Sequence, residues 1–307
     1  MKQFFGEKIL ISTSSFAAAD TEPLDMLKDA GCEVIDNPYK RRLTKPELLG
    51  LLSKGITGLI AGLEILDKEV MSKSRLKVIS RCGSGLSNVD LAAAKKLGII
   101  VCSTPDAPVS SVAELTIAAM LSLIRAMPVM DKELHKGRWA KRIGLLLEGK
   151  TVVIVGFGRI GRRLSQLLMP FKVRILVVDP LIKNSDADVT TLSLEKALSE
   201  ADIISIHSSG NGCIIGKNEL RKIKRGAFIL NASRGGAVDE GALIKALEKK
   251  HIAGAWLDVF EEEPYTGPLI KYPQVMLTPH VGSYTVECRK RMEMEAVKNL
   301  IKVLRKY

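Results

Sequence analysis

The sequence has no apolar run long enough to span a lipid bilayer, which takes about 20 residues in a helix. Its longest apolar stretch, Leu115–Ile124, stops at Arg125 and is better interpreted as a buried helix. The first seven residues also lack the apolar core of a secretory signal peptide. We therefore expect a cytoplasmic protein that has no membrane partner.

Cysteine is sparse, and no two cysteines form a C-x-x-C pair. The five are Cys32, Cys82, Cys102, Cys213 and Cys288. Such spacing indicates neither a disulfide framework nor a zinc site. We expect reduced thiols and no bound metal.

Aromatic residues make up only 5% of the chain, whereas the net charge is +12, from 46 basic and 34 acidic residues. This excess of positive charge is compatible with a solvated lysine-rich surface, an anionic metabolite or a nucleic acid. The basic residues are dispersed, apart from small clusters at 40–42 and 289–291. Because few aromatic rings are present to stack on bases, we expect no nucleic-acid partner.

Apolar runs of strand length alternate with helix-length segments along the whole chain, which predicts a parallel α/β architecture. The predicted strands are Lys8–Ser12, Glu33–Ile35, Gly58–Ala61, Lys77–Ser80, Ile99–Cys102, Thr151–Val155, Val173–Val178, Ile203–Ile206, Ala227–Leu230, Ala253–Leu257 and Val275–Leu277. The predicted helices are Glu22–Ala30, Lys45–Ser53, Lys68–Ser72, Asp90–Leu97, Arg159–Leu168 and, as an amphipathic helix, Val286–Leu304.

The segment Val155–Gly161 reads Val-Gly-Phe-Gly-Arg-Ile-Gly and joins the predicted strand Thr151–Val155 to the helix Arg159–Leu168. The next strand, Val173–Val178, is followed directly by Asp179. A strand, a glycine turn, a helix, a second strand and a terminal acid form the order of a dinucleotide-binding unit. The sequence therefore predicts a nucleotide site at this turn.

Each residue of this motif has its own physical role. Gly156 permits the tight turn, Gly158 lets backbone amides approach a pyrophosphate, and Gly161 lets the helix pack closely on the strand. The helix N-terminus then offers unpaired amides and partial positive charge to the phosphates. Asp179 would bind the adenosine ribose hydroxyls and repel a 2′-phosphate, so NAD is favoured over NADP.

The position of the motif predicts a second domain. A dinucleotide motif normally opens the first strand–helix unit of its fold, yet here five predicted strands come before it. We therefore predict two Rossmann-like or flavodoxin-like parallel-sheet domains.

Four further motifs follow predicted strands, where open parallel sheets bind their ligands. The glycine-rich loop 81–90 would expose amides to a carboxylate, or it is an ordinary turn. Arg234 would bind a planar anion, or it lies on the surface at a strand end. The acids 261–263 and His280 follow the last two strands, although a lone histidine there is more often structural than catalytic.

Taken together, these motifs resemble the D-isomer-specific 2-hydroxyacid dehydrogenase family, over nearly the whole chain. The segments that carry the resemblance are the late glycine motif, 231–240, 258–264 and 278–282. Within the family, Arg81 and the segments 112–116 and 239–243 are most similar to the catalytic portion of D-3-phosphoglycerate dehydrogenases. The resemblance implies a short form without the regulatory domain of the longer members.

The resemblance also implies how the chain is organised. Residues 1–104 and 284–307 would form a substrate-binding domain, and residues 105–283 an NAD-binding Rossmann domain. The active site would lie in the cleft between them, and two crossings of the chain would permit hinge closure. A homodimer is implied as well, formed through the helix Ser110–Met127 and the following segment to Leu147.

The roles of the family fall on matching residues of this chain. His280 would be the general acid and base, Glu263 would orient its imidazole, and Arg234 would bind the substrate carboxylate and polarise its carbonyl. The implied cofactor-binding residues are Gly156, Gly158, Arg159, Ile160, Gly161, Asp179, His207, Ala232, Asp258 and Gly282. The implied substrate-binding residues are Arg81, Ser84 and Gly85.

The implied activity is NAD-dependent hydride transfer at C2 of a small anionic D-2-hydroxy acid. Oxidation of 3-phosphoglycerate to 3-phosphohydroxypyruvate, for serine biosynthesis, is the first candidate. A reductase of glyoxylate, hydroxypyruvate or another 2-keto acid is the alternative, and an NAD(H)-sensing, co-repressor-like interaction protein is a third. Two departures bear on the choice: Gly62 replaces a basic residue of some phosphoglycerate dehydrogenases, and 207–210 reads His-Ser-Ser-Gly instead of the family's His-x-Pro-x.

Overall fold

The apolar runs of the sequence form two parallel sheets in the computed structural model, which describes residues 6–182, 189–210 and 212–306. The chain divides into two units, Met1–Pro108 with Ser283–Tyr307, and Val109–Gly282. The prediction of two parallel-sheet α/β domains is therefore confirmed.

The first unit is built on a five-stranded sheet in the order β2-β1-β3-β4-β5, with all neighbours parallel. Its strands are β1 (Lys8–Ile11), β2 (Glu33–Asp36), β3 (Gly58–Ala61), β4 (Val78–Arg81) and β5 (Ile100–Cys102). The central strand β3 is buried along its whole length. Its unbroken apolar run is typical of a parallel sheet that helices cover on both faces.

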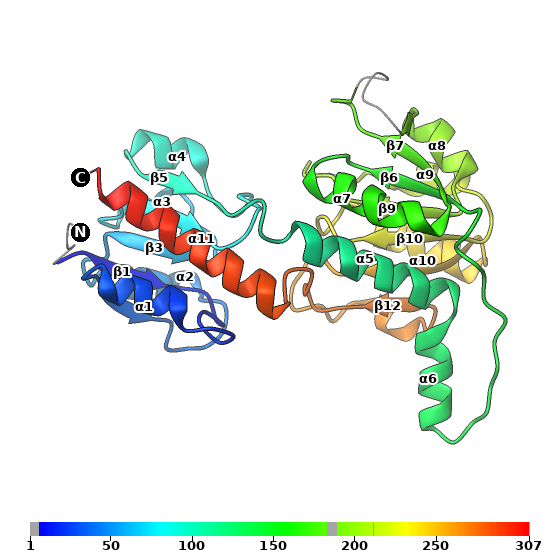
Figure 1. Cartoon of the computed structure of the whole chain (residues 1–307), viewed down its shortest axis with the longest axis horizontal. Helices are drawn as coiled ribbons and strands as arrows, with labels where there is room; N and C mark the ends of the chain where they lie inside the picture. Colours follow the sequence, from blue (N-terminus) through cyan, green and yellow to red (C-terminus); the bar gives the residue numbers. More distant parts are fainter. Residues whose placement is uncertain (1–5, 183–188, 211, 307) are drawn as a thin grey trace. The chain divides into compact units, whose positions relative to one another are not determined.

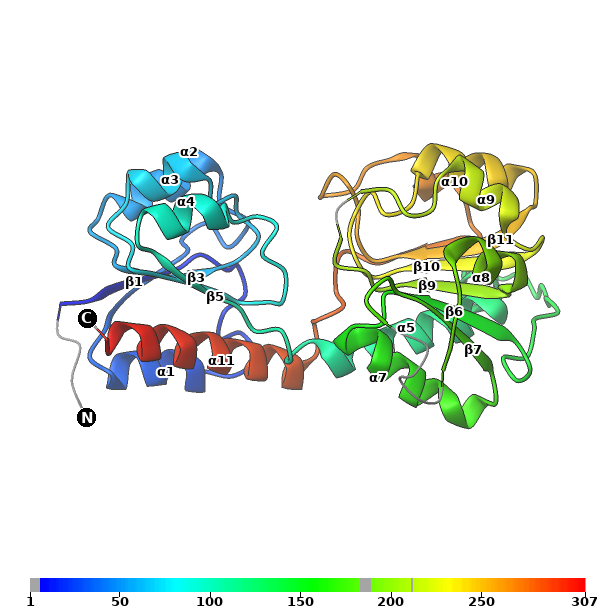
Figure 2. The same cartoon turned by 90° about the horizontal axis from the view of Figure 1, so that it is seen from above.

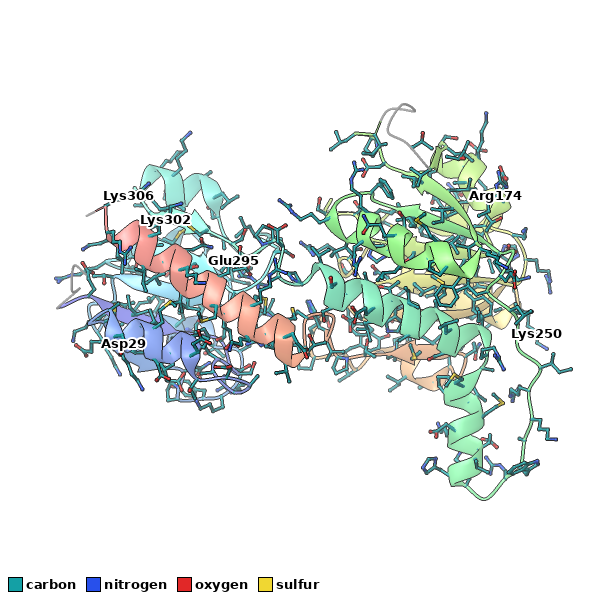
Figure 3. All side chains as sticks on the ribbon, viewed as in Figure 1. Asp29, Arg174, Lys250, Glu295, Lys302 and Lys306 are labelled. Atoms are coloured by element: carbon teal, nitrogen blue, oxygen red, sulfur yellow. The ribbon has the colours of Figure 1, made fainter. Side chains whose placement is uncertain are left out.

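Helices cover both faces of this sheet (Figures 1 and 2). One face carries α1 (Glu22–Asp29) and α11 (Val286–Leu304), and the other carries α2 (Lys45–Leu52), α3 (Lys68–Ser72) and α4 (Leu91–Lys96). The apolar stripe of α11 is buried. Its exposed side is charged, as the labelled Lys302 illustrates (Figure 3).

The second unit is built on a seven-stranded parallel sheet in the order β12-β11-β10-β9-β6-β7-β8. Its strands are β6 (Thr151–Val155), β7 (Arg174–Val178), β8 (Thr190–Thr191), β9 (Ile203–Ile206), β10 (Ala227–Asn231), β11 (Ile252–Leu257) and β12 (Val275–Leu277). From β6 the chain builds first toward β7 and β8, and then returns to β9 on the opposite side. This reversal creates a topological switch point beside β6, where sheets of this kind bind ligands.

The helices of the second unit form two layers on its sheet (Figure 2). One layer contains α5 (Val109–Ile124) and α7 (Arg159–Leu168), and the other contains α8 (Leu194–Glu200), α9 (Lys217–Lys222) and α10 (Glu240–Glu248). Two short 3₁₀ helices span Met169–Phe171 and Pro268–Lys271. The sequence interpretation did not include α8, α9, α10 or β8.

The predicted helix Ser110–Met127 ends earlier than expected, at Ile124. Ala126 adopts a left-handed conformation with a φ of 50°, and α6 (Met127–His135) begins at the next residue. Pro128 favours this start because it lacks an amide hydrogen and has a φ suited to a first helical turn. The helix α6 therefore leaves the body of the unit (Figure 1).

Among the described residues, no single helix has the length and apolar character needed to cross a membrane. The helices α5 and α6 together reach that length and composition, but they meet at a bend of 67°.

Candidate active site

The predicted site residues of the second unit gather along one edge of its sheet. Each follows the carboxyl end of a different strand: Gly156 follows β6, Asp179 follows β7, His207 follows β9, Arg234 comes after β10, Asp258 follows β11, and His280 comes after β12. Because all seven strands are parallel, these six ends share the edge at which such sheets bind ligands.

The glycine turn after β6 is packed too tightly for side chains at two of its three glycines. Gly156 has a φ of +92°, and a Cβ atom placed on it would lie 2.6 Å from the amide nitrogen of Ser208. A Cβ atom on Gly161 would lie 2.2 Å from the carbonyl oxygen of Gly156. Gly158 caps α7, and the space beside it is open. The turn thus leaves room above the N-terminus of α7 for a pyrophosphate, which the helix end attracts.

The first residues of α7 and Asp179 complete this cradle. Arg159 and Ile160 open the helix, so their amides belong to its unpaired first turn. The Asp179 carboxylate accepts hydrogen bonds from the amides of Phe157, at 2.7 Å, and Leu181, at 2.9 Å. The acid is therefore fixed beside the glycine turn, at the end of β7, as ribose recognition requires.

His207 lies at the switch point, next to the glycine turn. Its amide donates to the carbonyl oxygen of Val155 at 2.7 Å, and its Nε2 atom lies 2.8 Å from Oγ of Ser205. Burial lowers the pKa of His207 to about 4, so the ring is neutral at neutral pH. Its buried Nδ1 atom finds no hydrogen-bond partner among the described residues, which suits a ring that faces a bound cofactor.

The departure from the family pattern after His207 lies in an irregular segment, residues 207–210. The amide of Gly210 donates to Oγ of Ser208 at 3.2 Å. The backbone of His207 and Ser208 is what approaches Gly156 most closely. The altered sequence therefore still supplies the wall against which the glycine turn packs.

His280 and Glu263 form a hydrogen-bonded pair. The Nδ1 atom of His280 lies 2.9 Å from Oε2 and 3.2 Å from Oε1 of Glu263. The imidazole is 43% exposed and the carboxylate 27%, so both remain accessible to a ligand. His280 itself has a positive φ of 54°, a conformation that costs energy in a residue with a side chain and persists only where surrounding contacts hold it.

Asp258 holds the loop that carries His280. The residue is only 2% exposed, and its carboxylate accepts hydrogen bonds from the amides of Val281, at 2.9 Å, and Gly282, at 2.8 Å. It also accepts a hydrogen bond from Oγ1 of Thr278, which in turn accepts one from the indole nitrogen of Trp256. Asp258 thus anchors both sides of His280, and the cofactor contact predicted for it stays a prediction.

Arg234 belongs to a loop that packs directly on the loop of Glu263. A Cβ atom on Gly235 would lie 2.0 Å from the carbonyl oxygen of Phe260, so only glycine permits this approach. The Arg234 guanidinium donates to the carbonyl oxygen of Ser233 at 2.7 Å through Nη1. Its buried Nε atom has no hydrogen-bond partner in the described part of the chain, which leaves a donor for an anion.

Two predicted cofactor residues lie within these loops. Ala232 follows β10 directly and is half-buried. Gly282 is buried, and its carbonyl oxygen accepts a hydrogen bond from Oγ of Ser111 at 2.7 Å. A Cβ atom on Gly282 would lie 3.1 Å from the Asp258 carboxylate, so a larger residue would crowd the anchor.

The predicted substrate-binding residues belong to the first unit. Arg81 ends β4, and its guanidinium donates to the carbonyl oxygen of Cys82, which folds it over Gly83. Gly83 has a φ of +142°, and its amide donates to Oγ1 of Thr104 at 2.8 Å. Ser84 is exposed and Gly85 is half-buried, so the loop presents its backbone at the surface of the unit.

Sequence reasoning noted Gly62 in the loop that follows β3, beside the glycine-rich loop, but missed Glu64. Glu64 is 2% exposed, and its carboxylate accepts hydrogen bonds from Oγ of Ser12 and, at 3.0 Å, from the amide of Gly62. The Asn88 side chain donates to the carbonyl oxygens of Glu64 and Gly62 and so joins the two loops. A single acid in the apolar stretch 63–66 was the available signal.

Comparison with known proteins agrees with this geometry. Residues 117–282 match the family described as D-isomer specific 2-hydroxyacid dehydrogenase, NAD binding domain. A glyoxylate reductase of Thermofilum pendens is 37% identical over 300 residues, which cover 92% of this chain and 88% of that protein. A D-3-phosphoglycerate dehydrogenase of Archaeoglobus fulgidus is 31% identical over 91% of this chain, but the chain spans only 55% of that relative's length.

Solved structures show the same fold over nearly the whole chain. The TT0316 protein from Thermus thermophilus has a TM-score of 0.90 and 34% identity, and the match covers 97% of each chain. A glyoxylate reductase from Paecilomyes thermophila has a TM-score of 0.85 and 28% identity, with 98% of this chain and 95% of that chain covered.

The fold and its glycine turn define an NAD-binding enzyme with two parallel α/β units. The chain belongs to the D-isomer specific 2-hydroxyacid dehydrogenase family. The described residues fit the cofactor, because the open space at Gly158, the amides at the start of α7 and the unpartnered Nδ1 of His207 all lie at the same sheet edge.

Proposed function

We propose that the enzyme transfers a hydride between NAD and C2 of a D-2-hydroxy acid, with His280, Glu263 and Arg234 as its catalytic residues. The observation that supports this most directly is the 2.9 Å contact between Nδ1 of His280 and Oε2 of Glu263. In the oxidative direction, C2 loses a hydride and its hydroxyl loses a proton, which yields a 2-keto acid, NADH and a proton. Bound NAD supplies the hydride acceptor.

The pair assigns a separate role to each ring nitrogen of His280. An ionised carboxylate can only accept hydrogen bonds, so Nδ1 must carry the proton that binds Glu263. Nε2 is then free to take the hydroxyl proton during oxidation and return it during reduction. Glu263 also stabilises the imidazolium that forms when Nε2 is protonated.

Arg234 would bind the carboxylate and the carbonyl oxygen of the substrate. Its buried Nε donor has no protein partner in the described residues, so an anion can complete its hydrogen bonding. A guanidinium at the carbonyl oxygen draws electrons from C2 and promotes hydride addition. We propose that the backbone amides of Ser84 and Gly85 bind the remainder of the carboxylate.

Residues around the glycine turn would hold the cofactor. We assign the pyrophosphate to the amides at Gly158, Arg159 and Ile160, and the adenosine ribose to Asp179. His207, Ala232, Asp258 and Gly282 would surround the nicotinamide end. These assignments follow the order of the strand ends along the sheet.

Two kinds of acid are candidates for the substrate of the enzyme. The names of several relatives favour 3-phosphoglycerate. Arg81 and the positive net charge would help to bind a substrate that carries both a carboxylate and a phosphate. This candidate would place the enzyme in serine biosynthesis. It requires a cation for the phosphate beside the carboxylate-binding loop.

The loop after β3 favours a small 2-keto acid without a second anion, such as glyoxylate. Asn88 joins the loop after β3 to the glycine-rich loop, so the loop after β3 flanks the proposed carboxylate site. It buries the Glu64 carboxylate and exposes the apolar side chains of Leu63, at 42%, and Ile65, at 57%. A phosphate placed there would meet an acid and apolar groups instead of the charged partner that phosphate binding uses. The glyoxylate reductase relatives support this choice.

A substrate panel tests these assignments. The purified enzyme is supplied with NADH and, separately, glyoxylate, hydroxypyruvate or 3-phosphohydroxypyruvate, and NADH absorbance is followed. We expect a higher kcat/KM for glyoxylate and hydroxypyruvate, which carry no phosphate, than for 3-phosphohydroxypyruvate. Preference for the phosphorylated acid would restore the first candidate. NADH binding without turnover of any acid would instead favour a cofactor-sensing interaction protein.

We further propose a homodimer formed through α5, α6 and the segment that leads to β6. This region exposes Met127, Leu134, Trp139, Ile143 and Leu146. Figure 3 shows the side chains of α6 and the segment after it standing away from the rest of their unit. Large exposed apolar residues grouped in this way are typical of a protein interface. Light scattering of the purified protein should give twice the 33.5 kDa chain mass, and a monomer would refute the proposal.

A further inference from the structure

A buried ion pair lies within α11, outside the proposed catalytic and cofactor-binding residues. Arg289 donates through Nη2 to Oε1 of Glu293, four residues further along the helix. The Arg289 side chain is 13% exposed and the Glu293 side chain 1%. Burial raises the pKa of Glu293, although Arg289 opposes this effect. Placing both charges out of water is costly unless each finds further partners.

Those further partners lie in the β1–α1 loop, residues 12–21. Oε2 of Glu293 accepts a hydrogen bond from the amide of Ala17 at 2.8 Å. Nη2 of Arg289 donates to the carbonyl oxygen of Ser15 at 3.4 Å. Ala17 has a positive φ of 57°, a strained conformation that surrounding contacts must hold. The pair therefore fixes the backbone of a loop at the carboxyl end of β1.

The same helix braces the end of β4, from which the glycine-rich loop starts. Oγ of Ser80 donates to the carbonyl oxygen of Ala296 at 2.7 Å. Cys82 is buried in the same apolar cluster as Met292, the neighbour of Glu293. Arg289 and Glu293 both act electrostatically on the Cys82 thiol. The helix that carries the pair thus supports the end of β4, and the pair itself lies close enough to Cys82 for its charges to influence the thiol.

Arg289 also contacts the segment that leads into α11 from the loop of His280. Its guanidinium lies over the ring of Tyr284, 5.4 Å from the ring centroid. The pair therefore contacts the β1–α1 loop and Tyr284, while its helix holds the end of β4 through the carbonyl oxygen of Ala296. Buried pairs of this kind often contribute little net stability, and their best-attested use is to specify one arrangement of the chain.

We propose that Arg289 and Glu293 are positioning residues for substrate binding, which hold the β1–α1 loop and the Arg81–Gly85 loop in one fixed arrangement. The inference rests on the proposed function, because it assumes that the Arg81–Gly85 loop receives the substrate carboxylate. The pair touches neither substrate nor cofactor. Its loss should weaken substrate binding and leave hydride transfer in the saturated enzyme intact.

The test compares two variants of the ion pair with one control variant on the same helix. Arg289→Leu combined with Glu293→Leu removes both charges, so no buried charge is left unpaired and folding should be retained. Arg289→Lys keeps the charge but loses the planar fork. Lys290→Ala is the matched control. Lys290, 43% exposed on the same helix, also reaches the end of the β1–α1 loop, at Asp20, but its pairs with Asp20 at 2.8 Å and Glu22 at 2.7 Å lie at the surface, where ion pairs contribute little. KM, kcat, NADH affinity and thermal midpoint are measured for each protein.

We expect the double variant to raise KM for the 2-keto acid about tenfold, with kcat and NADH affinity within about twofold of wild type. Arg289→Lys should recover part of the loss, and Lys290→Ala should leave KM unchanged. Unchanged KM in both the double variant and Arg289→Lys would overturn the inference, even if the thermal midpoint falls. If the double variant does not fold, Arg289→Lys decides by the same KM criterion. Wild-type enzyme that turns over no acid on the panel would instead refute the proposed function.

Discussion

Nδ1 of His280 lies 2.9 Å from Oε2 of Glu263, which joins the loop after β12 to the loop after β11. Asp258, at the start of the second loop, also binds the amides of Val281 and Gly282. Glu263 thus holds the ring of His280, and Asp258 holds the backbone that follows it. Such double support fixes both the orientation and the tautomer of the histidine.

Replacing His280 should remove proton transfer and spare the cofactor site. We expect His280→Ala to lower kcat by at least about 10²-fold, because positioned general acids and bases contribute about that much. NADH affinity, measured by fluorescence titration, should change little, since the glycine turn and Asp179 are untouched. Near-normal turnover in this variant would show that another group moves the proton.

Asp179 should control the choice between NAD and NADP. Its carboxylate is fixed by the amides of Phe157 and Leu181, so in the proposed cofactor site it presents a negative charge to the 2′-position of the ribose. We expect Asp179→Ala to raise KM for NADH about tenfold and to narrow the preference over NADPH. Kinetics with both cofactors measure this. Equal KM values for NADH in wild type and variant would contradict the ribose role.

The strand ends that bear the site could be predicted from sequence because parallel sheets impose strong local patterns. The run Thr151–Val155 is wholly apolar after its first residue, a glycine turn follows it, and the next strand delivers Asp179. Each of these signals is local and depends on one element. The end of the predicted helix Ser110–Met127 was wrong. Ala126 adopts a left-handed conformation, and alanine does not indicate such a conformation in a sequence as glycine does.

Contacts between distant loops could not be predicted in the same way. Asp258 was expected to face the cofactor, and nothing in its neighbours indicates that its oxygens bind amides more than twenty residues away. The helices α8, α9 and α10 were not predicted either. Each buries an apolar face in the cluster that also contains the strands of the second sheet, so its stability depends on packing with residues distant in the sequence.

Gly235 should be intolerant of any side chain. A Cβ atom there would lie 2.0 Å from the carbonyl oxygen of Phe260, so Gly235→Ala must push the loop of Arg234 away from the loop of Glu263. We expect kcat to fall about tenfold or more, because misplacements of about 1 Å have large effects on catalysis. Gly241→Ala is the control, since its Cβ would make only ordinary contact, 3.5 Å from the nearest atom. Equal kcat in the two variants would disprove the close packing.

His207 should make the protein less stable in mild acid. Burial lowers the pKa of His207 to about 4, whereas an unfolded histidine titrates near ~6.5. Between these values the unfolded chain binds more protons, so this contribution to stability is complete above pH ~6.5 and is lost as the pH falls toward 4. From pH 7.5 to 5.0, the free energy of unfolding in urea should therefore fall by about 2 kcal/mol more in wild type than in His207→Asn.

His135→Asn, at an exposed histidine of α6, is the control, and its free energy of unfolding should fall as much as that of wild type. Parallel loss in wild type and His207→Asn would mean that the ring is protonated as readily in the folded chain as in the unfolded one, which the burial of its unpartnered Nδ1 argues against.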